Sequence, residues 1–362
     1  MKRRIDIPLL ISFILLVLIG LMMVYSASNV VALYKYNDKF YFFKRQFIFG
    51  VVGILVMIFF IKVSLEKIYK LTTLIFIISI ITLILVLIPG IGMVRGGARS
   101  WIGFGSLSMQ PAEFMKICII LLLAKYLSNH DDDLNKFSQF MFILVIIILI
   151  FGLIMLQPDL GTGIVLVGSS ILLLFCSGAP IKYFVLLVLL GVIGIVMLII
   201  SAPYRIERIL AFLDPWSDPL GSGFQTIQSL YAISPSGIFG LGFNKSMQKH
   251  FFLPEPQNDF IFAIVCEEFG LIGGVILLAL FFFMIFRIIK ISRKVRNKYY
   301  KYLSLGIGLI YFVQVFINVG VVIGLLPVTG ITLPIISYGG SSLILSMIMI
   351  AIVLNISKYQ EV

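Results

Sequence analysis

Residues 140–163 read FMFILVIIILIFGLIMLQPDLGTG, and this stretch decides in which solvent the chain folds. From Phe140 to Leu156 no side chain carries a polar group, and Gln157 is the first that does. Crossing the hydrocarbon core of a bilayer takes roughly 20 apolar residues in a helix. Comparable runs begin near Ile7, Gln46, Leu71, Pro111, Phe140, Gly161, Tyr183, Phe260, Leu303 and Ser341. The pattern therefore predicts about ten transmembrane helices.

The composition supports the same class of protein. Of the 362 residues, 60% are hydrophobic and only 12% are charged, with a mean hydropathy of +1.13. A water-soluble domain cannot bury this much apolar surface. Alternation typical of strands is absent, so a membrane β-barrel is not expected. We predict an all-α integral membrane protein that forms one polytopic domain over residues 1–362.

Basic residues predict the orientation. Seven Lys and Arg residues lie between Arg287 and Lys301, and Lys2, Arg3 and Arg4 precede the first span. Such residues are enriched in the cytoplasmic segments of membrane proteins. We expect both termini on the cytoplasmic side of the plasma membrane. The formal net charge of +12 is explained by attraction to anionic lipid, without any nucleic-acid partner.

Two segments are too long to be simple connections, and this topology places both outside the cell. The first covers residues 90–110, and the second covers residues 202–258, between spans 7 and 8. In the second, Ile206, Ile209, Leu210 and Leu213 share one helical face, and Phe224, Ile227, Gln228 and Tyr231 repeat the pattern. The spacing predicts helices at the membrane surface. The alternative is that these helices pack on the bundle.

Polar residues gather at the ends of several spans on the expected outer side. Gln110, Glu113 and Lys116 are three residues apart and share one face of a helix. Asp159 lies in QPDLGTG, where another span begins. Ionisable groups in a membrane cost free energy and therefore point to function. These residues are candidates for a site, although pairing that only stabilises the bundle is the alternative.

Asp259 precedes the eighth span, and Glu267 and Glu268 follow it in the same helix. With a rise of about 1.5 Å per residue, Lys116 and Glu267 reach similar depths, roughly 9 and 12 Å below Gln110 and Asp259. A charge pair among Lys116, Glu113 and Glu267 is thus compatible with the spacing. From its position, Asp259 is as well suited to capping the helix as to catalysis.

Five ordered segments carry a resemblance to a known family. They cover about 250 residues and are RGGARSWIGFGSLSMQPAEFMK, QPDLGTG, DPLGSGFQTIQSLYA, GLGFNKSMQKHFFLPEPQNDFIFA and LPVTGITLPIISYGGSS. Together they resemble the SEDS proteins (shape, elongation, division and sporulation). YSAS near the first span, KRQ before the second and LPEPQNDF before the eighth are most similar to the FtsW/SpoVE branch, and RodA is more distant.

The resemblance implies a peptidoglycan glycosyltransferase that polymerises lipid II on the outer face of the membrane. Family members work with a class B penicillin-binding protein and with other division or sporulation proteins. The aspartate needed for polymerisation falls on Asp259, which is the expected base. The conserved polar groups of the fourth span fall on Glu113 and Lys116. The residues expected to bind substrate, including cations suited to the pyrophosphate, are Arg99, Gln110, Glu113, Lys116, Asp159, Arg205 and Arg208.

Two other functions fit parts of the sequence. Intramembrane charges would also suit a transporter that flips lipid II, although no internal repeat typical of transporters is visible. A non-catalytic scaffold could dock its partners on the basic segment between Arg287 and Lys301. A histidine-based zinc site is not expected, because His130 and His250 fall on opposite sides of the membrane, and the sequence indicates no definite cofactor. Assistance of the pyrophosphate by a divalent cation is the open alternative.

Overall fold

The computed structural model describes residues 5–95, 97–104, 107–130, 136–200, 206, 210 and 212–361. Ten helices of 17–33 residues dominate this part of the chain: α1 (Ile7–Tyr36), α2 (Tyr41–Lys62), α3 (Leu65–Leu85), α4 (Pro111–Asn129), α5 (Phe137–Met155), α6 (Leu160–Cys176), α7 (Ile181–Ile200), α10 (Ile261–Arg293), α11 (Lys298–Val322) and α12 (Gly340–Ile356). The smaller elements are strands β1 (Gly92–Arg95), β2 (Ala98–Phe104) and β3 (Leu107–Met109), helix α9 (Phe224–Ile233), and three short 3₁₀ helices, η2 (Pro215–Ser217), η3 (Ser234–Ser236) and η4 (Ser357–Tyr359).

The ten long helices occupy the positions at which hydropathy predicts spans. Within the described residues, seven helices are long and apolar enough to cross a membrane: α1, α2, α3, α5, α10, α11, and α12 continued by η4 to Tyr359. The helices α6 and α7 are apolar but contribute shorter stretches, and α4 contains three charged residues. Helices α2, α3 and α11 begin five or six residues earlier than the apolar runs, because their first turns carry basic and acidic side chains.

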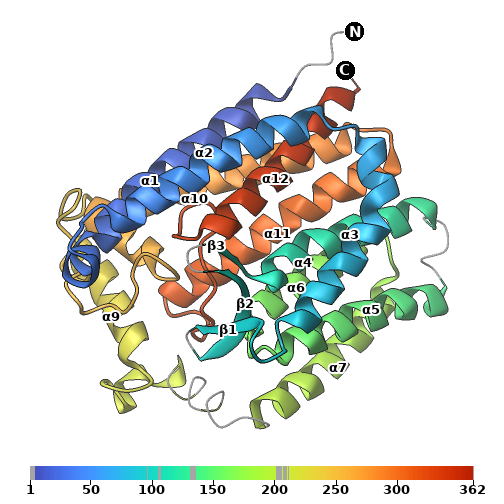
Figure 1. Cartoon of the computed structure of the whole chain (residues 1–362). Coiled ribbons are helices and arrows are strands. Elements are labelled where there is room, and N and C mark those ends of the chain that lie inside the picture. The colour runs from blue at the N-terminus through green and yellow to red at the C-terminus, as the bar shows by residue number, and fades with distance from the viewer. Residues whose placement is uncertain are drawn as a thin grey trace.

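Helix α11 lies at the centre of the bundle. It contacts α4, α6, α9, α10 and α12. Of its most apolar 18-residue stretch, 83% is buried inside the protein, against 22% for the corresponding stretches of α2 and α3. Figure 1 shows α1, α2, α10 and α12 on one side of it and α4 to α7 on the other. The apolar outer faces of α2 and α3 are therefore among the surfaces available to lipid.

Both termini lie at one end of the molecule (Figure 1). There Arg287 of α10 forms an ion pair with Asp6, which caps α1, and the Glu361 N–H donates to the carbonyl of Lys294 over 2.9 Å. We call this the terminal end. The opposite end, which carries the sheet, α9 and the first residues of α4, α6 and α10, we call the site end.

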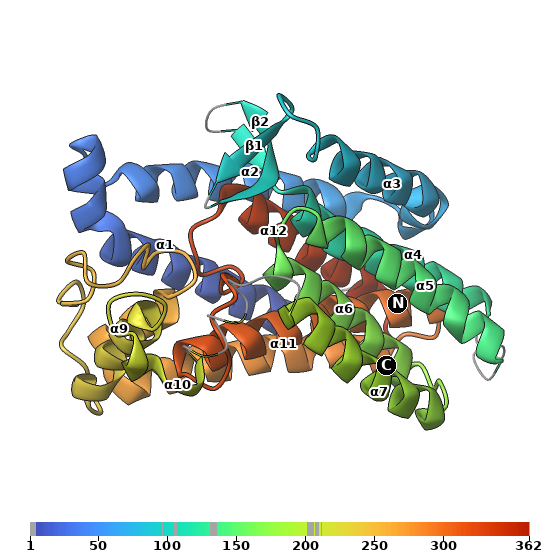
Figure 2. The same cartoon turned by 90° about the horizontal axis from the view of Figure 1, so that it is seen from below.

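Residues 90–110, expected as a long outer segment of an all-α protein, contain a small antiparallel sheet in the order β1-β2-β3. Gly92 pairs with Ile102, and Ile102 pairs with Met109. The all-α description is thus wrong for this segment, although the protein as a whole is mostly helical. Strands of four, seven and three residues leave too few positions for alternation to be visible. Figure 2 shows the sheet above the start of α12.

Two irregular segments enter the bundle from the site end, at residues 237–260 and 323–339. Five side chains of the second segment are buried in sequence, from Leu333 to Ser337. Backbone at membrane depth must have its polar groups satisfied by protein. Accordingly, Gln46 of α2 donates to the carbonyl of Ser337, and the Gly339 N–H donates back to Gln46.

The described part of residues 202–258 packs at least partly on the bundle. Helix α9 contacts α10 and α11, and Ser229 donates to the carbonyl of Val322. Ile227 is buried as the pattern predicts, but Tyr231 is 48% exposed and faces Trp216. A surface helix around residues 206–213 lies largely outside the described residues, and its place at the membrane surface stays a prediction.

Candidate functional site

Helix α4 begins with the three polar residues that the sequence places on one face. Pro111 occupies the first turn, and Gln110 is the N-cap. The Lys116 ammonium lies 2.7 Å from a carboxylate oxygen of Glu113, and their side chains are 3% and 13% exposed. Ser342, at the start of α12, donates to the other oxygen of Glu113 over 3.3 Å. The predicted contact between Glu113 and Lys116 is present, and its role in a reaction stays a prediction.

Lys116 has a second partner on the central helix. Its ammonium donates to Oε1 of Gln314 in α11 over 2.9 Å, and the amide nitrogen of Gln314 donates to the carbonyl of Thr332 over 3.0 Å. The cation is therefore held between α4 and α11. A buried ammonium with a carboxylate and an amide around it is fixed in position rather than free to follow solvent.

Asp259 lies one residue before the N-cap of α10 and is partly exposed. The N-cap is Phe260, which makes no side-chain capping hydrogen bond, so Asp259 lies one position before the N-cap expected from the sequence. The carbonyl of Asp259 accepts a hydrogen bond of 2.7 Å from the amide nitrogen of Asn318 in α11. Asp259 is thus held at the site end, one helical turn along α11 from the partner of Lys116.

Asp159 lies beside the first residues of α4. Its carboxylate caps α6 by accepting from the Thr162 N–H over 3.1 Å, and its other oxygen accepts from Gln110. Burial raises the pKa of Asp159, and Glu113 adds to this effect, whereas the hydrogen bonds from Thr162 and the charge of Lys116 oppose it. A raised pKa brings a carboxyl group closer to the range in which it can exchange protons near neutral pH.

Of the predicted arginines, the structure describes Arg99, which makes a different contact. Arg99, on β2, points its guanidinium toward the carbonyl of Leu87 at 3.4 Å, near the end of α3. Arg205 and Arg208 lie outside the described residues. The structure therefore brings together Gln110, Glu113, Lys116 and Asp159, ties Asp259 to the same central helix, and leaves the pyrophosphate role of the three arginines a prediction.

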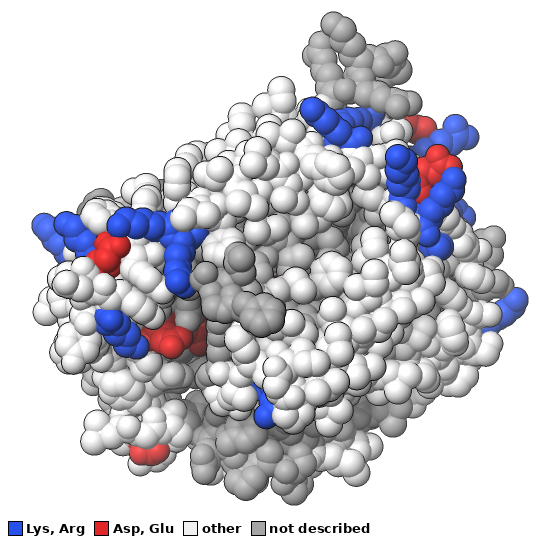
Figure 3. Space-filling view, viewed as in Figure 1, with Lys and Arg blue, Asp and Glu red and all other residues white. Residues whose placement is uncertain are grey.

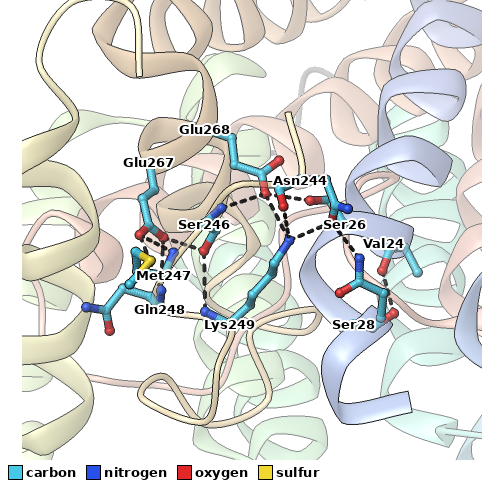
Figure 4. Close-up of polar contacts among 11 residues, drawn as sticks. Val24, Ser26, Ser28, Asn244, Ser246, Met247, Gln248, Lys249, Glu267 and Glu268 are labelled. Carbon is cyan, nitrogen blue, oxygen red and sulfur yellow. Dashed lines mark hydrogen bonds and ion pairs between the residues drawn. The ribbon is translucent and has the colours of Figure 1, made fainter. Parts of the chain in front are cut away.

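Glu267 and Glu268 belong to a different cluster, so the pairing of Glu267 with Lys116 is wrong. Glu267 accepts from Ser246 and from the Met247 N–H, the latter over 2.7 Å. Glu268 accepts from Ser26 of α1 and lies 3.6 Å from the Lys249 ammonium. Figure 4 shows these side chains converging from α10, α1 and the irregular segment. Similar depth is a weak guide to contact, because the two helices present these groups to different neighbours.

Several residues of the site were not predicted from the sequence. Gln314 and Asn318 stand in YFVQVFINVG, an otherwise apolar stretch, and two amides four residues apart in a buried span were a usable signal. Ser342 gave no such signal, because a Ser near a helix start is common. Within the described residues, no group of three or more His, Cys, Asp and Glu side chains is arranged to hold a metal ion.

The arrangement offers a carboxylate, a buried cation and a second carboxyl group at one end of a membrane bundle. A carboxylate at the membrane surface can take a proton from a hydroxyl group. A fixed ammonium can stabilise negative charge that develops on a leaving group. These two functions together fit a displacement reaction on a lipid-linked substrate with an anionic leaving group.

Comparisons with known proteins show the family and the fold of the chain. A family model described as "Cell cycle protein" and covering FtsW, RodA and SpoVE matches residues 7–362. The chain is 51% identical to "Stage V sporulation protein E" of Bacillus subtilis (strain 168), over 99% of both chains. It is 38% identical to "Probable peptidoglycan glycosyltransferase FtsW" of Saccharophagus degradans, over 98% of this chain and 93% of that protein.

Solved structures share the fold over nearly the full length. A chain in the structure described as "Structural coordination of polymerization and crosslinking by a peptidoglycan synthase complex" is 29% identical, with a TM-score of 0.80 and 99% of each chain covered. The rod shape determining protein RodA of Thermus thermophilus is 25% identical, with a TM-score of 0.74 and 99% of this chain and 98% of that chain covered. This chain is a multi-pass membrane protein that belongs to the FtsW/RodA/SpoVE family.

Proposed function

We propose that this protein is a peptidoglycan glycosyltransferase that polymerises lipid II at the outer face of the cytoplasmic membrane. The observation that carries the proposal is the anchoring of Asp259 and Lys116 to one buried helix, α11, at the site end. The names of the FtsW relatives and the peptidoglycan synthase complex that shares the fold support the same activity.

In the proposed reaction, Asp259 accepts the proton of the 4-hydroxyl group of one lipid II. The hydroxyl oxygen forms a bond to the anomeric carbon of the growing chain, and the bond from that carbon to undecaprenyl pyrophosphate breaks. The electron pair leaves with the pyrophosphate, whose charge Lys116 is placed to stabilise. The product linkage is inverted at this carbon, which fits a single displacement without a covalent enzyme intermediate.

The remaining polar residues have supporting roles in this proposal. Gln110 and Asp159 bind each other and flank the start of α4, where a sugar or phosphate oxygen can be bound. Arg99, Arg205 and Arg208 are proposed to attract the pyrophosphate from the outer loops. A divalent cation at the pyrophosphate remains compatible with the chemistry, although the structure contains no preformed group of ligands for it among the described residues.

The partner we propose is a class B penicillin-binding protein that crosslinks the product. The support is the likeness to a chain from a complex described as coordinating polymerization and crosslinking. Relatives named for sporulation and for FtsW make division or sporulation proteins the further candidates. The proposal places the site end at the outer face of the membrane. Both termini and residues 287–301 are then cytoplasmic, and residues 90–110 and 202–258 are outside.

The test is polymerisation of labelled lipid II by the purified full-length protein in detergent, with and without candidate class B partners. We expect the wild type to give a ladder of glycan products and Asp259→Asn to lose about 10²–10⁴-fold in rate while its yield and thermal midpoint stay near those of the wild type. A lipid II flippase would give no ladder, because transport has no product in detergent.

A full ladder from a well-folded Asp259→Asn variant would contradict the role of Asp259. Asn caps a helix about as well as Asp, so this substitution separates catalysis from capping. The matched variant Asp159→Asn then decides whether the second carboxyl group is the base. A non-catalytic scaffold would give no glycan ladder even as the wild-type protein.

A further inference from the structure

Helix α11 carries two buried amides on one face at the site end. Gln314 and Asn318 are 3% and 1% exposed and four residues apart, so their side chains lie one above the other, roughly 6 Å along the helix axis. Polar side chains at such positions are costly to bury unless they are hydrogen-bonded. Their contacts therefore show what they are held there to do.

Each amide joins one site residue to the same irregular segment. Gln314 accepts from the Lys116 ammonium over 2.9 Å and donates to the carbonyl of Thr332 over 3.0 Å. Asn318 uses its amide nitrogen twice, donating to the carbonyls of Asp259 and Ile331 over 2.7 Å each. Lys116, in α4, and Asp259, just before α10, are thus tied to neighbouring residues of α11 and of the same irregular segment.

We infer that Gln314 and Asn318 are positioning residues that fix the separation of the cation and the base. The inference rests on the proposed function, since it assumes that Lys116 and Asp259 take part in the reaction. Reacting groups must be held within fractions of an ångström, and a misplacement of about 1 Å can cost about 10²-fold in rate. Hydrogen bonds from both groups to the deeply buried helix α11 supply that rigidity.

Anchoring the irregular segment does not by itself explain the two amides. The same segment is held further along by Gln46, which contacts Ser337 and Gly339, and by the Tyr338 N–H, which donates to the carbonyl of Gln257 over 2.8 Å. Gln46 contacts neither Lys116 nor Asp259 in these hydrogen bonds. What distinguishes Gln314 and Asn318 is that their second partners are the site residues.

Asn355 provides a matched control for Asn318. It is 4% exposed, and its amide nitrogen also donates to two main-chain carbonyls, those of Phe60 and Val63, but at the terminal end. Asn318→Leu and Asn355→Leu therefore remove the same two kinds of hydrogen bond. We expect similar falls in thermal midpoint, with kcat for lipid II polymerisation lowered about 10²-fold in Asn318→Leu and within about threefold of wild type in Asn355→Leu.

Gln314 allows a test by conservative rescue. Gln314→Glu keeps an oxygen for Lys116 and loses the donor to Thr332, whereas Gln314→Met loses both contacts. Positioning of Lys116 predicts that the Glu variant retains at least about tenfold more kcat than the Met variant. Anchoring of the segment alone predicts equal losses or a worse Glu variant, because its carboxylate faces a carbonyl. If Asn318→Leu does not fold, this pair decides the matter.

The double variant Asp259→Asn/Asn318→Leu separates failure of this inference from failure of the proposed function. When two residues act as a unit, the effects of their substitutions on the rate do not add. The double variant is therefore expected to be no slower than Asp259→Asn alone. An Asp259→Asn variant without activity beside an Asn318→Leu variant that matches Asn355→Leu in kcat would overturn the positioning role and leave the proposed function standing. An active Asp259→Asn variant would overturn the proposed function itself, and this inference with it.

Discussion

Lys116 and Lys249 are two buried ammonium groups in matching chemical situations. Lys116 lies 2.7 Å from Glu113, and Lys249 lies 3.6 Å from Glu268, with lysine side chains 3% and 2% exposed. Their further partners differ. Lys116 reaches Gln314, next to the proposed site, whereas Lys249 donates to the carbonyl of Asn244 within its own segment over 2.7 Å. On these surroundings we propose a chemical role for Lys116 and a structural role for Lys249.

The two lysines should therefore respond differently to the same substitution. Removing one partner of a buried ion pair costs about 3–5 kcal/mol unless the remaining carboxylate takes up a proton. We expect both Lys116→Met and Lys249→Met to lower the thermal midpoint. Polymerisation per folded molecule should fall about 10²-fold or more only in Lys116→Met. The measurement is lipid II turnover normalised to the folded fraction from size-exclusion chromatography, and equal specific activities would make both pairs structural.

At the scale of elements, α10 is broken where the irregular segment meets it. Gly270 has a φ of 65° and a ψ of −164° inside the helix, and the N–H groups of Leu241 and Gly242 donate to the carbonyls of Glu267 and Glu268 over 2.9 Å each. A Cβ atom on Gly270 would lie 2.3 Å from the carbonyl oxygen of Ile238. The break thus lets the segment pair with α10 directly, next to the cluster in Figure 4.

Gly270→Ala is expected to destabilise the protein strongly. A non-glycine residue in this backbone conformation costs about 1–3 kcal/mol, and the close approach of Ile238 adds to that cost. Gly191→Ala is the control, because no atom lies within 4 Å of its Cβ position in α7 and Ala favours a helix over Gly by about 0.5–1 kcal/mol. Thermal unfolding in detergent should separate the two variants, and equal midpoints would show that the break is not needed.

Hydropathy predicts the helices well but not the segments between them. Lipid imposes long apolar runs, so the ten helix positions can be read from composition along the chain. The sheet and the two entering segments obey no such rule. They are held by contacts between residues far apart in sequence, such as Gln46 with Ser337 and Ser26 with Glu268. Local patterns contain no information about these partners.

In the candidate site, too, some contacts follow from local sequence and others only from the fold. The contact between Glu113 and Lys116 is local, because the two residues are one helical turn apart, and spacing alone suggests it. The convergence of Lys116 and Asp259 on α11 is a property of the folded bundle. The resemblance to a family supplied Asp259 as a candidate. The roles of Gln314 and Asn318 become visible only with their partners Lys116, Asp259 and residues 331–332.

For the whole molecule, charge defines two ends. Figure 3 shows Lys, Arg, Asp and Glu side chains gathered at opposite sides of this face, with a broad uncharged surface between them. One of these ends carries both termini (Figure 1) and the seven basic residues between Arg287 and Lys301. Basic residues are enriched on the cytoplasmic side, so the site end is the one expected to face outward, where a cell-wall precursor is polymerised.

This sidedness can be tested by labelling single cysteines in whole cells. Ser217, in η2 at the site end, and Ser64, in the turn between α2 and α3 at the terminal end, are both exposed. Cys118 and Cys266 are buried, whereas Cys176 is exposed, so the background is Cys176→Ser. A membrane-impermeant maleimide should modify Ser217→Cys in intact cells and Ser64→Cys only after permeabilisation. Each variant is first shown to polymerise lipid II. The reverse labelling pattern would place Asp259 and Lys116 on the cytoplasmic side, where they could not extend a glycan strand outside the cell.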